Sequence, residues 1–379
     1  MSASSPTPTT TPILDPSQAA AVEAMLTRNL LVVTGPPGSG KTTTVRTALA
    51  ALPPGAEVLL AAPTGKAARR LAQATDRPAT TIHRMLGYRG PGAWAYTREN
   101  PIRADLVVID ESSMLDYELA LAVLYACRLT RLVLVGDADQ LPPIGLGAFF
   151  RDLIASGVAP VARLATQHRA AAGSWVVRNA PRVLAGEALE LTADTWHECD
   201  SAAEVTERVV GLTAAAPAQV IAPMHSGACG ITELNARLAG SRMIEVGHRV
   251  IQTRNNYDLD VMNGEIGEVV ELGADGAAAV RWLDLDRSTH HSPREARDLE
   301  HAYALTAHRV QGSEYDRVLV VVHSSHVHML DRTILYTAIT RAKQGCVLVG
   351  DAKGLRYALK SMGSPRLTGL AARLSEAIA

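Results

Sequence analysis

Aromatic residues are scarce in this chain of 379 residues: they make up 4 % of it, and only two are phenylalanine. Aliphatic residues and alanine must therefore fill most of any hydrophobic core. Cysteine is rare as well, and no CxxC pair occurs among Cys127, Cys199, Cys229 and Cys346. This spacing argues against both a zinc site and a disulfide framework. Such cysteine usage is typical of the reducing cytoplasm, which is where we place the protein.

An excess of charge of either sign is missing too. The 37 Lys and Arg residues nearly balance the 38 Asp and Glu residues, for a formal net charge of −1. No bulk positive field draws the chain onto nucleic acid, so a polynucleotide site has to be a local groove. Long apolar runs that could span a membrane are absent from the sequence. Residues 1–12 are rich in Ser, Thr and Pro, lack the regions of a signal peptide, and are expected to form a disordered tail.

Strands and helices alternate along the rest of the chain. Four continuous apolar runs are typical of strands in a buried parallel sheet, at 30–34, 57–62, 106–109 and 132–135. Helices are predicted between them, at 16–28, 41–52 and 65–75. The fold class is therefore α/β with parallel sheets. The length also exceeds what one hydrophobic core usually serves, which favours more than one domain.

Two short strings recur in the same order in the second half of the chain. Ala62-Pro63 recurs as Ala222-Pro223, and the string at 133–138 recurs at 347–352. Although chance can produce strings this short, their order favours two related α/β cores. The two strings lie farther apart in the second half than in the first. An additional segment at 258–300, with the alternating pattern of short β-strands, accounts for the longer interval. We expect a first core over 13–160, a second over 161–257 and 301–379, a small β insertion over 258–300, and a β-hairpin with a Gly/Pro tip within about 86–102.

The residues at 35–42 match the pattern GxxxxGK[ST] in full, between a buried strand and a helix. Glycines let backbone N–H groups converge on phosphates, and the start of the helix adds partial positive charge. Lys41 supplies a charge to the β- and γ-phosphates of ATP, and the Thr42 hydroxyl can ligate Mg²⁺. The predicted nucleotide-binding residues of this loop are Gly35, Pro36, Pro37, Gly38, Ser39, Gly40, Lys41, Thr42 and Thr43.

Acidic and amide side chains follow the third and fourth predicted strands. Asp110 ends the strand at 106–109 and can hold Mg²⁺, while Glu111 beside it can orient and deprotonate an attacking water. Gln140 follows the fourth strand, and its amide can bridge the γ-phosphate or water to a neighbouring core. Two arginines of the second half, Arg169 and Arg341, could reach the nucleotide when the cores close. Each of these arginines, taken alone, is more often a surface residue.

These motifs together resemble the RecD-like branch of superfamily 1 (group 1B) DNA helicases, from about residue 15 to residue 360. The similar strings follow the family's order, at 17–18, 62–68, 80–84, 110–114, 136–143, 304–314 and 336–343. The resemblance implies two tandem RecA-like cores with ATP in the cleft between them. It also implies 5′→3′ movement on single-stranded DNA and unwinding of duplex forks. The hairpin would match the family's strand-separating pin, with Trp94 and Tyr96 at the fork, and the β insertion would match its small β-barrel.

The resemblance also implies roles for single residues. Gln18 would read adenine and Glu314 would accept from the ribose. DNA-binding residues carried over by position are Pro63, Thr64, Lys66 and His83 in the first core and Thr306, His308 and Gln311 in the second. His308 could instead be a buried structural histidine, and Trp94 and Tyr96 could pack within the hairpin. Arg169 departs from the family pattern, because His168 and Ala170 flank it.

Other functions remain open at this point. One alternative is a translocase or RNA-directed helicase of the same superfamily, and another is a nucleotide-gated nucleic-acid-binding module with low turnover. A metal cluster formed by His323, His326 and His328 is a minor alternative. For the main hypothesis we expect ATP and Mg²⁺ as cofactors, single-stranded DNA and forks as partners, no membrane, and a monomer. DNA repair and recombination are the processes that the resemblance implies.

Overall fold

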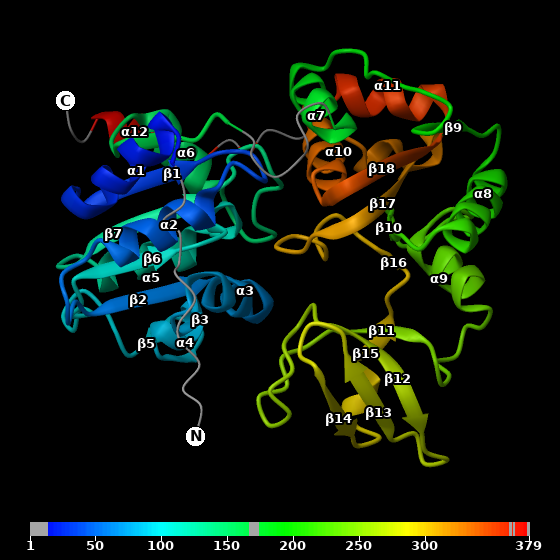
Figure 1. The fold of residues 1–379 in the computed structure, drawn as a ribbon, viewed down its shortest axis with the longest axis horizontal. Helices are drawn as coiled ribbons and strands as arrows, with labels where there is room; N and C mark the ends of the chain where they lie inside the picture. The colour runs from blue at the N-terminus through cyan, green and yellow to red at the C-terminus, as the bar shows by residue number, and fades with distance from the viewer. Residues whose placement is uncertain (1–13, 167–173, 364–365, 367, 377–379) are drawn as a thin grey trace, which may run out of the picture.

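The computed structural model describes residues 14–166, 174–363, 366 and 368–376, which form two parallel-sheet cores and a separate antiparallel sheet (Figure 1). The predicted tail at 1–12 and the predicted arginine Arg169 lie outside these residues. Throughout the described part of the chain, no helix combines the length and the apolar character needed to cross a membrane.

The first core is built on a six-stranded parallel sheet. Its strand order is β3-β2-β6-β7-β1-β8, with bounds Ala79–Thr81, Val58–Ala62, Leu106–Ile109, Arg131–Gly136, Leu30–Thr34 and Val161–Arg163. One face packs on α1 (Pro16–Thr27), α2 (Lys41–Ala50) and α3 (Gly65–Thr75). The other face packs on α4 (Ile82–Met85), α5 (Tyr117–Ala126) and α6 (Phe149–Ser156), with the 3₁₀ turn η1 (Ser112–Met114) after β6. The predicted strands β1, β2, β6 and β7 and the predicted helices α1, α2 and α3 are confirmed within a few residues at each end, and the other elements were not predicted.

The second core has a five-stranded parallel sheet. Its order is β16-β10-β17-β18-β9, with bounds Ala304–Leu305, Gln219–Ile221, Tyr315–Val322, Ala342–Gly350 and Trp196–Glu198. Its helices are α7 (Trp175–Ala185), α8 (Ala202–Ala215), α9 (Ile231–Ala239), η3 (Ser324–Met329), α10 (Arg332–Ile339) and α11 (Ala352–Lys360). The two sheets share one arrangement, since β2, β6, β7 and β1 correspond in position to β10, β17, β18 and β9. The two recurring strings fall on equivalent strands.

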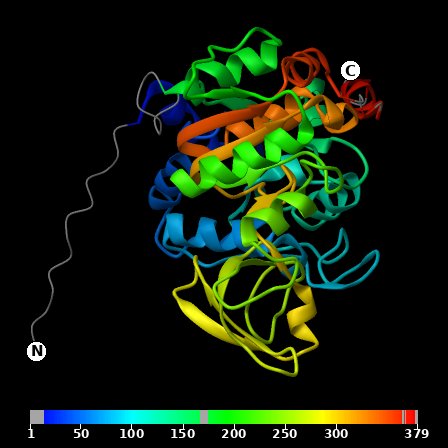
Figure 2. The ribbon, with the colours of Figure 1, turned by 90° about the vertical axis from the view of Figure 1, so that its right-hand side faces the viewer.

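A five-stranded antiparallel sheet is inserted between β10 and β16. Its order is β14-β13-β12-β11-β15, with bounds Arg287–His291, Ala278–Trp282, Ile266–Leu272, Arg249–Gln252 and Leu299–His301, and η2 (Glu295–Asp298) precedes the last strand. Buried Trp282 anchors its small core and donates to Thr289 Oγ1 at 2.7 Å. The sheet occupies the end of the molecule opposite the C-terminal helix (Figure 2). β11 lies before the expected start at 258, and β14 and β15 are edges, so the expected barrel is not confirmed.

A two-stranded antiparallel hairpin lies within the range where one was expected in the first core. β4 (Tyr88–Gly90) pairs antiparallel with β5 (Ala93–Trp94). Gly92 between them has a φ of 68°, a left-handed conformation that glycine adopts without strain. The hairpin is a side branch between β3 and β6 and adds no strand to the main sheet.

The chain returns to the first core after the second is complete. α12 (Leu370–Glu376) packs against α6, and Thr368 Oγ1 donates to Asp152 Oδ2 at 2.7 Å. The Arg366 guanidinium donates to the carbonyl oxygens of Gly145 and Gly147, at 2.5 and 2.7 Å. β8 also lies past residue 160, in the first sheet. Both ends of the second core are therefore joined to the first, which the expected division at 160 did not foresee.

Candidate nucleotide site between the two cores

The phosphate loop runs from the end of β1 to the start of α2. Gly38 and Gly40 have φ values of 80° and 79°, so their backbones turn in a way that favours glycine. A Cβ added at Gly35 would lie 2.6 Å from the Leu164 carbonyl oxygen, so this position also excludes a side chain. The Lys41 ammonium donates to the carbonyl oxygens of Gly35 and Pro36, at 2.7 and 3.0 Å. The loop carbonyl groups thus hold the Lys41 ammonium. The same ammonium could bind a phosphate group in their place.

The Gln18 side chain is hydrogen-bonded to the phosphate loop. Its Nε2 donates to the Ser39 carbonyl oxygen at 3.2 Å, and its Oε1 accepts from the Asp15 N–H at 3.1 Å. The Asp15 carboxylate in turn accepts from the Gln18 N–H at 3.0 Å, which completes a capping box at the start of α1. Both ends of the Gln18 amide take part in this support, and each end has the capacity for a second hydrogen bond.

Two adjacent carboxylates stand at the end of β6. The Glu111 backbone has a φ of 51°, uncommon for a residue other than glycine, and its N–H donates to Asp110 Oδ1 at 2.9 Å. Burial and the neighbouring Glu111 carboxylate raise the pKa of Asp110 to about 6. A strained backbone and two carboxylates held side by side are features that cluster at functional sites. A cation bound there would stabilise the ionised pair.

The second core contributes Arg341, which follows α10. Its guanidinium is buried and donates to the carbonyl oxygens of Thr337 and Ser313, at 3.0 and 3.3 Å. A third donation, at 3.3 Å, goes to Thr340 Oγ1. These contacts all lie within the second core, so the second core itself holds the arginine in position.

A cavity of about 370 Å³ brings these groups together. The predicted residues that line it are Pro37, Gly38, Gly40, Lys41, Thr42, Thr43, Asp110, Glu111, Gln140, Glu314 and Arg341. Its walls come from both cores, as expected for a nucleotide bound in the cleft. These predicted residues therefore meet in space, although they span 37 to 341 in the chain, whereas Gln18, Gly35, Pro36 and Ser39 do not line the cavity.

Arg70 also lines this cavity, and sequence reasoning missed it. Its guanidinium forms an ion pair with Glu314 at 3.0 Å and donates to the carbonyl oxygen of Gly312. A usable signal was present, because Lys66, Arg69 and Arg70 fall three and four residues apart on one side of α3. That spacing points all three cations toward the second core and its inserted sheet.

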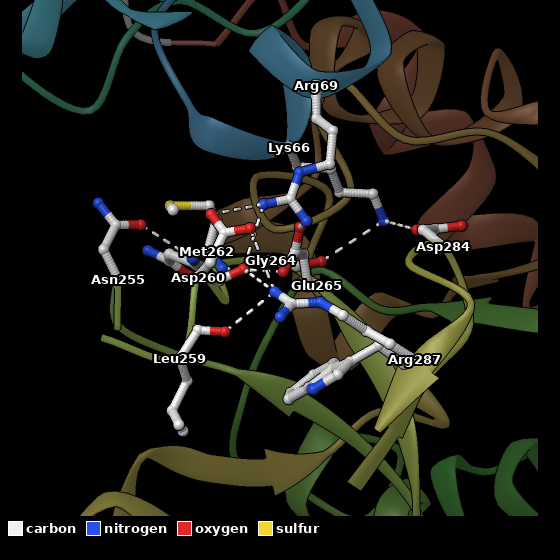
Figure 3. A network of polar contacts seen from close by, with 12 residues as sticks. Lys66, Arg69, Asn255, Leu259, Asp260, Met262, Gly264, Glu265, Asp284 and Arg287 are labelled. Carbon is white, nitrogen blue, oxygen red and sulfur yellow. Dashed lines mark hydrogen bonds and ion pairs between the residues drawn. The ribbon is translucent and has the colours of Figure 1, made fainter. Parts of the chain in front are cut away.

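Lys66 lies against the inserted sheet rather than on an open surface (Figure 3). Its ammonium pairs with Asp284 at 3.1 Å and lies 3.5 Å from the Gly264 carbonyl oxygen. Burial lowers the pKa of Lys66, and the Asp284 carboxylate acts in the opposite direction. Arg69 binds the same sheet through buried Glu265 at 2.9 Å. A DNA phosphate at Lys66 would have to displace Asp284.

The start of α3 is covered by the same insertion. Thr64 caps the helix, accepting from the Ala67 N–H at 3.2 Å, and follows Pro63. Gly65 packs so closely on Met262 that an added Cβ would lie 2.3 Å from its Cγ. Pro63 and Thr64, which are predicted to touch DNA and directly precede Gly65, thus lie next to the inserted sheet.

The predicted DNA contacts of the second core sit in the loop after β16. Thr306 is buried, and its hydroxyl accepts from the Arg309 N–H at 3.2 Å. Burial lowers the pKa of His308, so its imidazole is neutral at physiological pH. Gln311 donates to the Leu141 carbonyl oxygen at 3.0 Å, which makes it a contact between the cores.

Three rings gather where the hairpin meets α4. His83 lies 5.2 Å from Tyr88 and 5.6 Å from Trp94, and the last two rings are 5.0 Å apart. Trp94 therefore packs at the base of the hairpin. Packing within the hairpin was the alternative to a role of Trp94 at the DNA fork. Tyr96, at 39 % exposure, remains accessible.

The histidines near the end of the second sheet do not gather as metal ligands. His323 accepts from the Ser325 N–H at 3.1 Å, and His326 Nε2 lies 3.5 Å from Cys229 Sγ. Over the residues that the structure describes, no group of three or more His, Cys, Asp or Glu side chains could hold a metal ion.

Comparisons with known proteins agree with this architecture. A family model described as an AAA domain matches residues 13–206, and one described as a UvrD-like helicase C-terminal domain matches residues 301–349. An ATP-dependent RecD2 DNA helicase of Deinococcus radiodurans is 37 % identical, over 95 % of this chain and 52 % of its own length. The chain thus spans about half of that relative. The RecBCD enzyme subunit RecD of Mycolicibacterium smegmatis is 34 % identical, over 95 % of this chain and 75 % of its own.

Solved structures resemble the fold more distantly. A Pif1 helicase from Bacteroides in complex with ADP-AlF3 and ssDNA has a TM-score of 0.60 and 17 % identity, covering 96 % of this chain and 97 % of its own. Pif1 helicase from Candida albicans has a TM-score of 0.58 and 16 % identity, with 97 % and 99 % covered. At such identity the likeness concerns the fold alone. The sequence relatives decide the family: this chain belongs to the RecD-like branch of superfamily 1 helicases.

Proposed function

We propose that this protein is an ATP-dependent DNA helicase that moves 5′→3′ on single-stranded DNA and unwinds duplex. One observation carries the proposal: Arg341 of the second core lies in the same cavity as Lys41 and Glu111 of the first. A site shared by two cores makes hydrolysis depend on their closure, and release of the products reopens them. A small-molecule kinase with a phosphate loop has no need of a second core.

The proposed chemistry uses residues from both walls of the cavity. Glu111 accepts the proton of a water that attacks the γ-phosphorus, while the bond from that phosphorus to the β-phosphate oxygen breaks. ADP and inorganic phosphate are the products. Lys41 and Arg341 stabilise the charge that spreads over the transferring group. Arg169 remains a proposed second arginine, and Gln18 and Glu314 remain proposed contacts for adenine and ribose.

Thr42 and Asp110 are the residues proposed to hold Mg²⁺. Both line the cavity beside the phosphate loop, and their hydroxyl and carboxylate oxygens are the ligands that this ion prefers. The ion would neutralise charge on the β- and γ-phosphate oxygens. The raised pKa of Asp110 supports this role, because a buried carboxylate pair without a cation is costly to ionise.

DNA is proposed to lie across both cores. The first core would contribute Pro63, Thr64, Lys66 and His83, and the second Thr306, His308 and Gln311. Backbone contacts from such side chains position a strand without reading its sequence, which suits a motor. The hairpin, with Trp94 and Tyr96, is proposed as the strand-separating pin, and the inserted sheet as the family's small β-barrel. We further propose that the protein acts as a cytoplasmic monomer in DNA repair or recombination.

Polarity-resolved unwinding tests the proposal. Duplexes with a 5′ tail, a 3′ tail or a fork are incubated with ATP and Mg²⁺, and strand release is followed by fluorescence. We expect release from 5′-tailed and forked substrates, and none from any substrate with Lys41→Ala. Release from 3′ tails alone would overturn the polarity. ATP hydrolysis stimulated by poly(U) but not poly(dT) would favour RNA, and hydrolysis without strand release would favour a translocase.

A further inference from the structure

A buried hydrogen bond joins the two cores beside the nucleotide cavity. Asp137 follows β7 in the first core, and Tyr336 lies on α10 in the second. The Tyr336 hydroxyl donates to Asp137 Oδ2 at 3.0 Å, and both residues are 1 % exposed. Burial and the Asp137 carboxylate raise the pKa of Tyr336, so the phenol retains its proton and remains a donor.

The same carboxylate oxygen also binds Gln140. Gln140 Nε2 donates to Asp137 Oδ2 at 3.0 Å, and the Asp139 N–H donates to Oδ1 at 3.0 Å. A carboxylate only accepts hydrogen bonds, so the amide nitrogen of Gln140 must be the end that faces Asp137. Its side-chain oxygen then faces away. That oxygen is buried and has no hydrogen-bond partner in the described part of the chain.

The surrounding backbone is fixed from both cores as well. Arg151 donates to the carbonyl oxygens of Ala138 and Gln140, at 2.5 and 2.8 Å. The Leu141 N–H donates to Thr337 Oγ1 of α10 at 3.0 Å. Gln140 therefore has little freedom to turn while the cores are in contact. Gln140 is one of the residues that line the nucleotide cavity, so its buried, unpaired oxygen lies close to the space that a nucleotide would occupy.

We propose that Asp137 and Tyr336 are positioning residues for ATP hydrolysis, which hold Gln140 so that its side-chain oxygen accepts a hydrogen bond from the attacking water. Phosphate oxygens only accept, so an amide oxygen facing them would be repelled, whereas water can donate to it. The Tyr336 contact crosses between the cores, so contact between the cores adds a second donor to the carboxylate oxygen that holds Gln140. The inference rests on the proposed function, because it assigns a role within that hydrolysis.

Tyr336→Phe tests the proposal, because it removes the hydroxyl and keeps the ring. We expect kcat for DNA-stimulated ATP hydrolysis to fall about tenfold or more, with KM for ATP within about twofold of wild type. Asp137→Asn should lower kcat in the same way, since its amide can donate to Gln140 and turn it. Tyr303→Phe is the matched control. The Tyr303 hydroxyl accepts from the Arg249 N–H at 3.2 Å, away from the cavity, and its loss should leave kcat unchanged.

A double-mutant cycle separates positioning from a general structural effect. In a Gln140→Ala background, Tyr336→Phe should change kcat by less than about twofold, because the group that it positions is gone. An equal loss of kcat in both backgrounds would overturn the proposal, and so would a raised KM with kcat intact. If wild-type protein hydrolyses no ATP, the proposed function itself fails. If wild type and Gln140→Ala differ as expected but Tyr336→Phe equals wild type, only this inference fails.

Discussion

Glu111 combines an unusual backbone conformation with a place in the nucleotide cavity. We predict that Glu111→Gln lowers ATP turnover by about 10³-fold, because an amide cannot take the proton of the attacking water. Nucleotide affinity should remain near that of wild type, since size and hydrogen-bonding reach are kept. Steady-state hydrolysis and titration with a fluorescent nucleotide measure the two quantities. Unchanged turnover would support the nucleotide-gated binding module instead.

His326 gives the fold a measurable dependence on pH. Burial, together with the nearby His323, lowers the pKa of this imidazole to about 4, while an unfolded chain keeps a value near ~6.5. The unfolded state therefore binds more protons between these values. Stability from neutral His326 is complete above about pH 6.5 and is lost progressively as the pH falls to 4.

The loss should be on the order of 2 kcal/mol in the free energy of unfolding. We predict that His326→Gln removes this part of the pH dependence, because the amide does not titrate. Urea unfolding at several pH values measures it. If the free energies of unfolding of wild type and variant change in parallel from pH 7 to 4, His326 is not the source of this pH dependence.

Local patterns were sufficient to predict one wall of the site. The loop at 35–42 and the pair Asp110–Glu111 carry their chemistry in adjacent residues, so the sequence alone located them. The contacts of Arg70 with Glu314 and of Asp137 with Tyr336 join residues that are 244 and 199 positions apart. Such pairs depend on how the cores pack, which no local pattern encodes. Lys66 was assigned to DNA, and its partner Asp284 could not be foreseen for the same reason.

At the scale of elements, α3 and the inserted segment share several ion pairs, and one of them joins Lys66 to Asp284. If Lys66 binds DNA phosphate, its ammonium must first leave Asp284. Lys66→Ala and Asp284→Ala should therefore change DNA affinity in opposite directions. We predict that Lys66→Ala weakens DNA binding for every sequence and flattens its salt dependence. Asp284→Ala should strengthen binding a few-fold. Fluorescence anisotropy at several salt concentrations measures both, and a sequence-selective effect would contradict a backbone contact.

Arg242→Ala serves as the control for surface charge. Arg242 pairs with Glu233 at 2.8 Å on α9, away from α3 and the inserted sheet. Its loss should leave the slope of affinity against salt unchanged. If Asp284→Ala lowers affinity as Lys66→Ala does, the ionic contact is needed for the DNA-binding conformation.

The hairpin offers a separate test. Shortening residues 89–93 should leave DNA-stimulated ATP hydrolysis near wild type and abolish strand release, because the hairpin adds no strand to the core sheet. Parallel assays on one forked substrate measure the two activities. An equal loss of both would show that the packing of Trp94 on His83 supports the first core.

Four strands of the first core, β1, β2, β6 and β7, were predictable because apolar runs mark them. The limits of the insertion were not, because β11 is joined to its sheet only through pairing with β12 and β15. Sequence alternation identified the middle of that sheet and missed its first strand. Hydrogen-bond partners that are distant in the chain decide where such a unit begins.

For the whole molecule, α12 makes the first core discontinuous in sequence. Leu370 and Leu374 pack against the apolar cluster that also contains Phe149 and Phe150. We predict that replacing both leucines with alanine lowers the free energy of unfolding by ~2 kcal/mol and Tm by a few degrees, because each is partly buried. Differential scanning calorimetry measures the shift. Arg373→Ala on the exposed side of the same helix is the control, and an equal shift there would contradict the packing argument.

The return of α12 has a mechanical consequence. The chain passes between the cores twice, once between β8 and α7 and once between α11 and α12. Parts of the first core, β8 and α12, therefore bound the second core at both of its chain ends. A cut in one connection would leave the cores joined by the other and would remove this double restraint. We expect coupling between ATP and movement to decline while each core stays folded.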